Sequence, residues 1–461
     1  MIYFRENELK KLETFFKSNK KAMAIYGRRR TGKTELVLEY IRSHKNIIYF
    51  QCTGYDYNVC LRDFKETVKS AVAKKSEIPV DTVISSLSSF REVISVAVSL
   101  DKNICGIIID EFPFLAKKNE NVTAEFQWII DHGLNGKKLV LLGSNRSFMK
   151  HQIENNESPL YGRFDEIIQV NPFTFSEVNS LFPSFEDAVD VYAKTGGVAQ
   201  YVMFFKNYDS VEAATEDLFF NKDGRLFLEA NNMLMQEYRD VTTYINILRS
   251  FGGGEKDSGQ IASKTNMDHR AVFTYLAKLV EQNIIETVEN PLSQKKKEKR
   301  YRICDNIFRF NYTFIEPNVS MITAIGPESM KYILTDRYSE YLGFVYEDII
   351  RKNCYGYAAA GKIPFMPGIV GKWWGNIQEN GIWHESEVDL AAYDNDNIII
   401  GECKYKNKAC GISELELLQL KANFIPKKDR KVYYLIASKS GFTSEFKEKS
   451  LRDNIILIDQ V

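Results

Sequence analysis

Residues 27–34 have the types and spacing of a loop that binds the phosphates of a nucleotide. They read Gly27-Arg28-Arg29-Arg30-Thr31-Gly32-Lys33-Thr34 and fit the pattern G-x-x-x-x-G-K-[ST]. In this pattern the glycines let backbone N–H groups turn toward the β- and γ-phosphates, the lysine lies along their oxygens, and the threonine hydroxyl binds Mg²⁺. We therefore expect the whole loop to bind ATP and Thr34 to be a ligand of Mg²⁺.

Two acidic residues at the end of an apolar run supply the second half of such a site. Asp110 and Glu111 follow the run Ile104-Cys105-Gly106-Ile107-Ile108-Ile109. The first carboxylate is expected to hold Mg²⁺ through water, and the second to polarise the attacking water as a general base. The adjacent glutamate favours hydrolysis over transfer of the phosphoryl group to another substrate, so the pattern indicates an ATPase rather than a kinase.

Three polar residues further along the chain are candidates for contacts with the γ-phosphate. Ser144 and Asn145 follow the apolar run 138–143, and either side chain would position water or sense the γ-phosphate unless it only caps the next helix. Arg163 precedes the short apolar run 166–170. We expect it to stabilise developing charge in its own subunit or in a neighbouring one, with an internal salt bridge as the alternative.

A separate group of charged residues lies in the C-terminal third. Asp389 belongs to the strand-like segment 385–393, and Glu402 and Lys404 belong to the next one, 397–405. Because alternate residues of a strand point to one side, the two carboxylates and the lysine are expected to converge. The carboxylates would hold Mg²⁺ or Mn²⁺, and Lys404 would orient or activate water. The alternative is an edge strand whose charges keep it soluble.

The elements around these residues predict an α/β fold. Apolar runs of strand length recur through the first third, and the run before the phosphate loop is followed by a segment with helical spacing. Strand, glycine loop and helix is the order that the phosphate site requires. We expect strands at 22–26, 46–50, 104–109, 138–143 and 166–170. These make a P-loop NTPase core with a parallel sheet over 1–172 and a helical lid over 173–238.

The middle of the chain, 239–316, has the pattern of a winged helix-turn-helix. Helical segments at 258–265 and 267–280 precede short strands at 284–288 and 301–303, with the basic run 295–300 at the hairpin tip. One interpretation places the second helix in a DNA groove and the basic tip on phosphate. The other is a protein-interaction hinge with a solvated lysine turn, because Arg270 and Lys278 are the helix's few cations.

Composition narrows the class of protein. The 461 residues contain 61 Lys+Arg and 61 Asp+Glu, so the chain as a whole is not a generally basic nucleic-acid binder and any such surface is local. The seven cysteines form no C-x-x-C pair, which argues against a zinc module and a disulfide framework and predicts free thiols in a reducing cytosol. We expect a soluble cytoplasmic protein without a signal peptide or a membrane partner.

Taken together, the motifs of the first part resemble the archaeal-type ATPase family, in the STAND/AAA-like branch of P-loop NTPases. The segments that carry this resemblance are Phe4-Arg5-Glu6-x-Glu8-Leu9, the loop at 27–34, Ile109-Asp110-Glu111, Gly143-Ser144, Leu160-Tyr161-Gly162-Arg163 and Thr195-Gly196-Gly197. Members commonly have Gly-Gly-x-Pro in the lid, and here Ala199 stands in place of the proline.

The C-terminal group resembles the core of PD-(D/E)xK nucleases. This resemblance implies a restriction-endonuclease-like α/β domain over 317–461, with Glu347 as the helical acid, Asp389 as the central aspartate and Glu402-x-Lys404 as the signature. No proline precedes Asp389. The segment from Glu414 to Lys421 is expected to flank the site, with Gln419 or Lys421 near the scissile phosphate. Such a domain follows the ATPase and winged helix in many archaeal-type ATPases.

The sequence therefore predicts an ATP-binding and ATP-hydrolysing protein in which a nucleotide switch controls DNA binding and metal-dependent DNA cleavage. The alternative is a signalling or scaffold ATPase whose C-terminal domain binds a partner and cuts nothing. A third hypothesis is a sequence-specific transcription regulator that binds duplex DNA through the winged helix. ATP and DNA are the expected partners, and assembly into a homo-oligomer is left open.

Overall fold

The first unit of the chain is built on a five-stranded parallel sheet with the strand order β2-β3-β4-β1-β5. Its strands are β1 (Ala22–Tyr26), β2 (Ile47–Gln51), β3 (Gly106–Asp110), β4 (Lys138–Gly143) and β5 (Glu166–Gln169). Every residue of β1, β3 and β4 is buried, as apolar runs of a parallel sheet covered on both faces require. The five predicted strands and the α/β class are thus confirmed.

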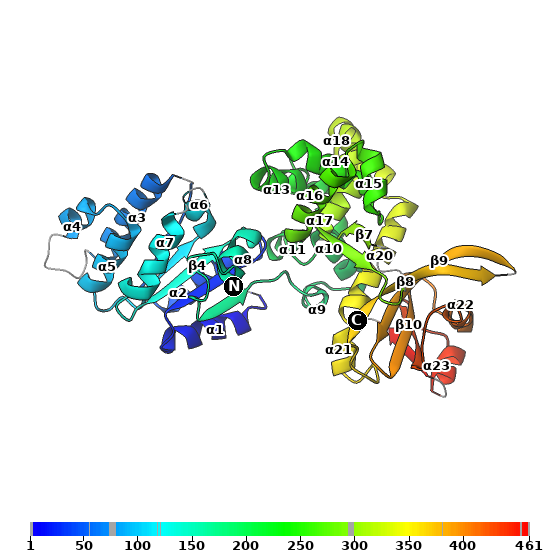
Figure 1. Cartoon of the computed structure of the whole chain (residues 1–461). Helices are drawn as coiled ribbons and strands as arrows, with labels where there is room; N and C mark the ends of the chain where they lie inside the picture. Colours follow the sequence, from blue (N-terminus) through cyan, green and yellow to red (C-terminus); the bar gives the residue numbers. More distant parts are fainter. Residues whose placement is uncertain are drawn as a thin grey trace. The chain divides into compact units, whose positions relative to one another are not determined.

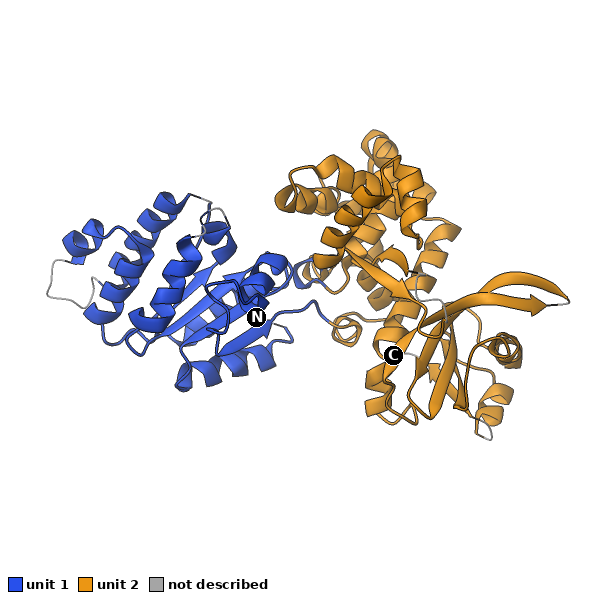
Figure 2. Cartoon of the chain, viewed as in Figure 1, with its two compact units in different colours: residues 1–173, 198–201 blue, residues 174–197, 202–461 orange. Residues whose placement is uncertain are grey.

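The computed structural model describes residues 3–54, 56–72, 80–117, 119, 121–293, 299–379, 381–451 and 454–459. These divide into two compact units (Figure 2). The first comprises Met1–Phe173 with Val198–Tyr201, and the second comprises Thr174–Gly197 with Val202–Val461. The predicted boundaries at 238/239 and 316/317 fall inside the second unit and remain predictions.

Helices cover both faces of the first sheet because alternate strand residues point to opposite sides. Met23 and Ile25 of β1 face α1 (Glu6–Lys17) and α2 (Lys33–Ser43). Ala22 and Ala24 face the other helical layer. That layer contains α3 (Tyr57–Val72), α4 (Val80–Ser86), α5 (Phe90–Leu100), α6 (Phe112–Ala116), α7 (Asn121–Trp128) and α8 (Arg146–Glu154). The phosphate loop lies between β1 and α2, as predicted (Figure 1).

The second unit starts with helices and continues with a helix-helix-hairpin segment. The helices of the predicted lid are α9 (Phe175–Asn179), α10 (Phe185–Thr195), α11 (Ala199–Phe205), α12 (Val211–Phe219) and α13 (Glu229–Glu237). They are followed by α14 (Val241–Phe251), α15 (Ser258–Thr265), α16 (His269–Glu281) and the antiparallel pair β6 (Ile285–Glu289) and β7 (Lys299–Ile303). Residues 294–298 of the basic run lie outside the described residues, whereas Lys299 and Arg300 belong to β7.

A mixed five-stranded sheet, in the order β12-β11-β10-β9-β8, forms the C-terminal part. Its strands are β8 (Ile369–Glu379), β9 (Ile382–Tyr393), β10 (Asn397–Lys404), β11 (Lys431–Ser438) and β12 (Ile455–Asp459). β8, β9 and β10 pair antiparallel, while β10, β11 and β12 pair parallel. Short helices α17 (Asn306–Phe310), α18 (Val319–Ile325) and α19 (Met330–Ile333) lead to α20 (Asp336–Lys352) and α21 (Cys354–Ala359), and α22 (Ile412–Ala422) and α23 (Ser444–Ser450) complete the part.

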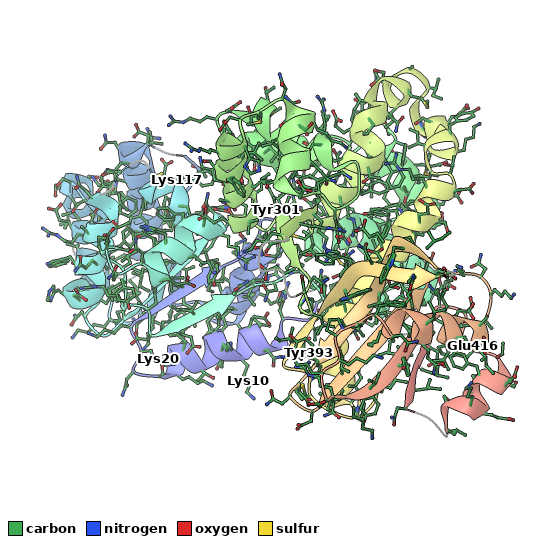
Figure 3. All side chains as sticks on the ribbon, turned by 45° about the vertical axis from the view of Figure 1, so that its right-hand side comes forward. Lys10, Lys20, Lys117, Tyr301, Tyr393 and Glu416 are labelled. Atoms are coloured by element: carbon green, nitrogen blue, oxygen red, sulfur yellow. The ribbon has the colours of Figure 1, made fainter. Side chains whose placement is uncertain are left out.

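In the C-terminal part, β8 and β9 project as a ribbon and the sheet contacts the β6–β7 segment. The ends of β8 and β9 run beyond the sheet as a two-stranded ribbon (Figure 1). β8 was missed by the sequence analysis, which predicted β9 and β10 as the strand-like segments 385–393 and 397–405. The sheet is fastened to the β6–β7 segment, because the Tyr393 hydroxyl donates to the Pro291 carbonyl (3.0 Å) and Asn290 Nδ2 donates to the Trp374 carbonyl (2.7 Å). Tyr301 of β7 and Tyr393 of β9 are labelled in Figure 3.

Candidate functional site

The phosphate loop is held in its shape by one obligatory glycine and by Lys33. A Cβ on Gly27 would lie 2.2 Å from the carbonyl oxygen of Val170, so no other residue fits there. Lys33 Nζ donates to the carbonyl oxygens of Gly27 (3.0 Å) and Arg28 (2.9 Å). Burial lowers the pKa of Lys33 to about 8, although Glu111 and Asp110 oppose the shift. The lysine is thus in the loop, poised for phosphate oxygens.

Asp110 and Thr34, the two predicted Mg²⁺ residues of this site, lie against each other. Thr34 Oγ1 donates to Asp110 Oδ2 at 2.7 Å, and the Tyr49 hydroxyl donates to the same oxygen at 2.9 Å. Asp110 Oδ1 accepts the backbone N–H of Glu111 at 2.8 Å. A hydroxyl and a carboxylate side by side at the end of the sheet are the oxygen donors that Mg²⁺ prefers, so the residues present fit this ion.

Glu111 is next to Ser144, as a general base and a water-positioning hydroxyl would be. Ser144 Oγ donates to Glu111 Oε2 at 2.7 Å. Glu111 has a φ of 54°, a left-handed conformation that is costly for a residue with a side chain and is found at functional sites. Asn145 caps helix α8, where its Oδ1 accepts the backbone N–H of Phe148 at 2.9 Å. Ser144 therefore lies beside the proposed general base, and the sensor role of either residue remains a prediction.

Arg163 is not brought to the phosphate loop of its own chain. Its Nε donates to Asp131 Oδ2 at 3.2 Å, which is the internal salt bridge that the sequence left as an alternative. Arg163 comes before Glu166, which pairs with Met23 near the start of β1, whereas the loop follows the end of β1. The arginine therefore lies near the amino-terminal ends of the strands, whereas the loop lies at their carboxyl-terminal ends. This placement disfavours the role within one subunit and leaves the role toward a neighbouring copy as a prediction.

Arg5 and Tyr201 contact the loop, and the sequence analysis assigned a role to neither side chain. Arg5 is 6% exposed and donates to the carbonyl oxygens of Thr31 (3.0 Å) and Asn171 (2.8 Å), so it ties the loop to the segment after β5. The guanidinium carbons of Arg28 and Arg30 lie 5.5 Å and 5.6 Å from the ring centre of Tyr201. Only Arg5 had a sequence signal, since it belongs to the opening segment of the family resemblance.

The C-terminal candidates converge as predicted from the strand spacing. The carboxyl groups of Asp389 on β9 and Glu402 on β10 are hydrogen-bonded to each other. Asp389 Oδ2 also accepts the backbone N–H of Cys403 at 2.8 Å. Glu402 Oε2 pairs with Lys404 Nζ at 3.0 Å, and Glu402 Oε1 pairs with Lys421 Nζ from α22. Both carboxylates are buried, with Asp389 9% and Glu402 4% exposed.

Burial and neighbouring charges shift the pKa values of the three acids in this group. Burial raises the pKa of Asp389, and the carboxylates of Glu347 and Glu402 raise it further. Burial also raises the pKa of Glu347 to about 7. The pKa of Glu402 is lowered, because Lys404 and Lys421 outweigh the opposing effect of its burial. Acids crowded so closely that the pKa of two of them is raised fit a divalent cation, whose charge would stabilise their ionised forms.

Within the described ranges, no group of three or more His, Cys, Asp and Glu side chains has the arrangement of a metal site. Mg²⁺ is commonly held by one or two carboxylates with water in its other positions, so Asp389 and Glu402 suffice for it.

Helix α20 brings Glu347 to this group through Arg351, which the sequence analysis missed. Arg351 Nε donates to the backbone carbonyl of Asp389 at 3.1 Å, and its Nη2 lies 3.8 Å from Glu347 Oε2. The next residue of the helix, Asp348, pairs with Arg351, with Arg302 of β7 and with Arg309 of α17. These cations hold the pKa of Asp348 well below its usual range despite burial. No local pattern could reveal this cluster, because the arginines of β7 and α17 lie 46 and 39 residues before Asp348.

Comparisons with known proteins support an ATPase domain in the first part of the chain. A family described as an ATPase domain found predominantly in Archaea matches residues 3–205, and a family of archaeal and bacterial proteins of unknown function matches residues 311–417. An uncharacterized protein of Methanocaldococcus jannaschii is 32% identical over 454 residues, which cover 95% of this chain and 96% of that protein.

Among solved structures, the Walker-type ATPase paby2304 of Pyrococcus abyssi superposes with a TM-score of 0.51 at 19% identity, over 68% of this chain and 96% of its own. This likeness shows that the two chains share the α/β fold of P-loop NTPases. Within the described part of the chain, no helix has the length and apolar character that a bilayer crossing demands.

Proposed function

Because the chain belongs to the same family as the Methanocaldococcus jannaschii protein and carries the ATPase domain found predominantly in Archaea, we propose that it hydrolyses ATP and uses the nucleotide state to control metal-dependent DNA cleavage. The observation that carries the first half is the contact between Thr34 and Asp110 beside Lys33. The observation that carries the second half is the buried Asp389–Glu402 pair flanked by two lysines.

In the proposed ATPase reaction, residues of the loop bind the phosphates and Glu111 handles the proton. Lys33 exchanges the carbonyls of Gly27 and Arg28 for phosphate oxygens. Thr34 and Asp110 would hold Mg²⁺, which neutralises charge on the β- and γ-phosphates. Glu111 Oε2 takes the proton of the attacking water, and Ser144 Oγ orients that carboxylate by donating to it.

In the proposed cleavage reaction, the C-terminal sheet supplies the acids and the lysine. The order of an acid-bearing helix, three antiparallel strands, a helix and a parallel strand supports the resemblance to the PD-(D/E)xK core. Asp389 and Glu402 would hold Mg²⁺ or Mn²⁺, which supplies a water of lowered pKa and neutralises phosphate charge. Lys404 orients this water and Lys421 lies on the other oxygen of Glu402, next to the scissile phosphate.

The segment from α14 to β7 supports DNA contact as a winged helix. Three helices followed by an antiparallel hairpin are the elements of that module. On α16, Arg270, Thr274 and Lys278 are exposed and available to a groove. The described end of the hairpin contributes Lys299 and Arg300.

The test is cleavage of labelled single-stranded, duplex and branched DNA by the full chain in Mg²⁺ or Mn²⁺, with and without ATP. Lys404→Ala should abolish cleavage and keep ATP hydrolysis, whereas Lys33→Ala should abolish hydrolysis and change the ATP dependence of cleavage. Lys331→Ala is the matched control, because this lysine is 61% exposed and pairs only loosely with Glu328 at 3.9 Å. Intact ATP hydrolysis without cleavage of any DNA would overturn the nuclease and favour the signalling or scaffold ATPase.

A further inference from the structure

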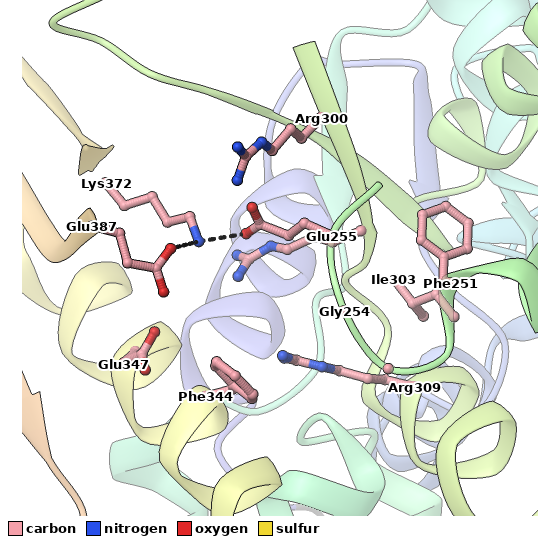
Figure 4. Close-up of a pocket in the computed structure, with 12 residues that line it drawn as sticks. Phe251, Gly254, Glu255, Arg300, Ile303, Arg309, Phe344, Glu347, Lys372 and Glu387 are labelled. Carbon is pink, nitrogen blue, oxygen red and sulfur yellow. Dashed lines mark hydrogen bonds and ion pairs between the residues drawn. The ribbon is translucent and has the colours of Figure 1, made fainter. Parts of the chain in front are cut away.

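A cavity of about 220 Å³ lies in the second unit, next to the acids of the proposed cleavage site. Its wall is formed on one side by the turn after α14 and by β7, and on the other by α20 and β8 (Figure 4). Glu347 is part of this wall, so the cavity borders the Asp389–Glu402 pair through the helical acid. A ligand group in this cavity would therefore be a neighbour of the cleavage site.

Arg309 is the best-prepared anion donor in the wall. It is 6% exposed, its guanidinium carbon lies 5.5 Å from the ring centre of Tyr341 and 5.9 Å from that of Phe344, and Nη1 donates to Asp348 Oδ2 at 3.1 Å. A guanidinium carries five N–H donors, and within the described residues Asp348 is the one acceptor that receives a hydrogen bond from it. Figure 4 shows the side chain extended toward Phe344 at the cavity wall. Arg309 is thus fixed in place with donors to spare.

Three more cations line the cavity: Arg302, which pairs with Glu286 and Asp348, and Lys372 and Arg300, each of which has an exposed carboxylate partner that a ligand can displace. Lys372 Nζ lies 2.8 Å from Glu255 Oε1 and 3.2 Å from Glu387 Oε2, as the dashed lines of Figure 4 show. Arg300 Nη2 lies 2.7 Å from Glu385 Oε1. The side chains of Glu387 and Glu385 are 48% and 65% exposed, and ion pairs with such exposed partners are weak. Phosphate oxygens can therefore replace these two carboxylates, while Lys372 keeps its contact with Glu255, whose side chain is 15% exposed.

The acids in the wall specify the charge of the ligand. Glu255, Glu347 and Glu387 all line the cavity, and they oppose a free anion of high charge. A phosphodiester carries a single negative charge and is held in addition by the rest of its strand. The mixed wall therefore fits a backbone phosphate better than inorganic phosphate.

We propose that this cavity binds the phosphodiester next to the one that is cleaved, with Arg309, Arg300 and Lys372 as its donors. The proposal rests on the proposed function, because it places the cleaved phosphate at Asp389 and Glu402. It assigns to β7 a second task besides DNA-groove contact: Arg300 joins the helix-helix-hairpin segment to the strand that enters the cleavage site.

The test measures DNA binding in the Asp389→Asn background, so that binding is read without cleavage. Lys372→Gln, Arg300→Gln and Arg309→Lys are compared with Lys331→Gln by fluorescence anisotropy of single-stranded and duplex oligonucleotides between 50 and 200 mM salt. Lys372→Gln and Arg300→Gln each remove a phosphate contact and should reduce the slope of log affinity against log salt by about 0.7 to 0.9, whereas Arg309→Lys keeps the charge and should lower the affinity without changing the slope. For Lys372→Gln and Arg300→Gln, the fall in affinity over this fourfold range of salt should then be about threefold smaller than in the control. A thermal unfolding curve that matches that of Lys331→Gln shows that a variant is folded. If Arg309→Lys is not folded, Arg300→Gln and Lys372→Gln still test the proposal.

The outcomes separate this inference from the proposed function. Salt slopes of Lys372→Gln and Arg300→Gln equal to that of Lys331→Gln would overturn the inference even if the wild-type chain cleaves DNA. Reduced slopes in a chain that never cleaves would support phosphodiester binding in the cavity but refute the nuclease and the placement of the cavity next to a cleaved phosphate. Absence of any oligonucleotide binding would overturn both. Inorganic phosphate at millimolar concentration is expected not to displace the oligonucleotide. Displacement that occurs with a wild-type cavity and is lost in Lys372→Gln would reassign the cavity to free phosphate.

Discussion

ATP binding is expected to weaken about tenfold when the pH rises from 7 to 9, because of Lys33. Burial lowers the pKa of this lysine to about 8. A lowered pKa means that the free site loses its proton above pH 8, so binding must restore the ammonium that the phosphates require. The protonated fraction falls from about 0.9 at pH 7 to about 0.1 at pH 9, and apparent affinity falls with it. This ratio corresponds to about 1.4 kcal/mol of binding free energy.

The assay is isothermal titration of the full chain with ATP and Mg²⁺ at half-unit steps of pH from 7 to 9.5. Runs in two buffers of different ionisation enthalpy count the protons taken up, which should approach one per ATP at pH 9 and vanish at pH 7. Terminal phosphates have a second pKa of about 6 and are already ionised over this range, so the nucleotide itself does not produce the effect.

Lys33→Ala serves as the control, since its weaker binding should show no uptake of this proton. An affinity that stays constant from pH 7 to 9.5, with no proton uptake, would refute the reasoning. It would mean that the carbonyl oxygens of Gly27 and Arg28, together with the nearby carboxylates, keep the buried ammonium charged.

Three substitutions test other parts of the structure. Gly27→Ala places a Cβ 2.2 Å from the Val170 oxygen and should abolish the rise in melting temperature that ATP produces; a retained rise would contradict the loop geometry. Ser144→Ala removes the hydrogen bond to Glu111 and should lower kcat for ATP about tenfold to a hundredfold with KM unchanged, measured by phosphate release; an unchanged kcat would remove Ser144 from the mechanism. Asp348→Asn removes the buried carboxylate that three arginines share and should cost the second unit about 3–5 kcal/mol in urea unfolding; a loss below about 1 kcal/mol would contradict a buried cluster.

The sequence predicted the nucleotide site well because its determinants are contiguous. The loop residues act through their own backbone, and Asp110 and Glu111 end a run whose apolar residues require a buried strand. Nothing of that kind marks β8. Its burial does not alternate, since a register shift between Gly371 and Trp373 breaks its pairing with β9 and moves side chains off the two-residue period.

Contacts between distant elements are the second kind of information that the sequence lacked. Arg163 precedes a strand in the sequence. The end of the sheet at which it lies is fixed by the direction in which β5 pairs with β1. Arg5 reaches a carbonyl 166 residues away, at Asn171. The convergence of Asp389 with Glu402 was predictable because a short turn joins their strands, whereas the pairing of Lys421 with Glu402 depends on how α22 packs on the sheet.

Helix α20 connects the predicted lid to the acids of the proposed cleavage site. The fully buried Lys194, at the end of α10, is held by Asp190 and donates to the Tyr338 hydroxyl at 2.6 Å. The Tyr341 hydroxyl donates to the carbonyl of Ala193 at 2.6 Å. Glu347 lies nine residues after Tyr338 on the same helix, or about 14 Å at 1.5 Å per residue. Since α10 leads directly into the Gly196-Gly197 turn, we expect a shift of that turn on nucleotide binding to reach Glu347 through α20, without movement of the helix-helix-hairpin segment.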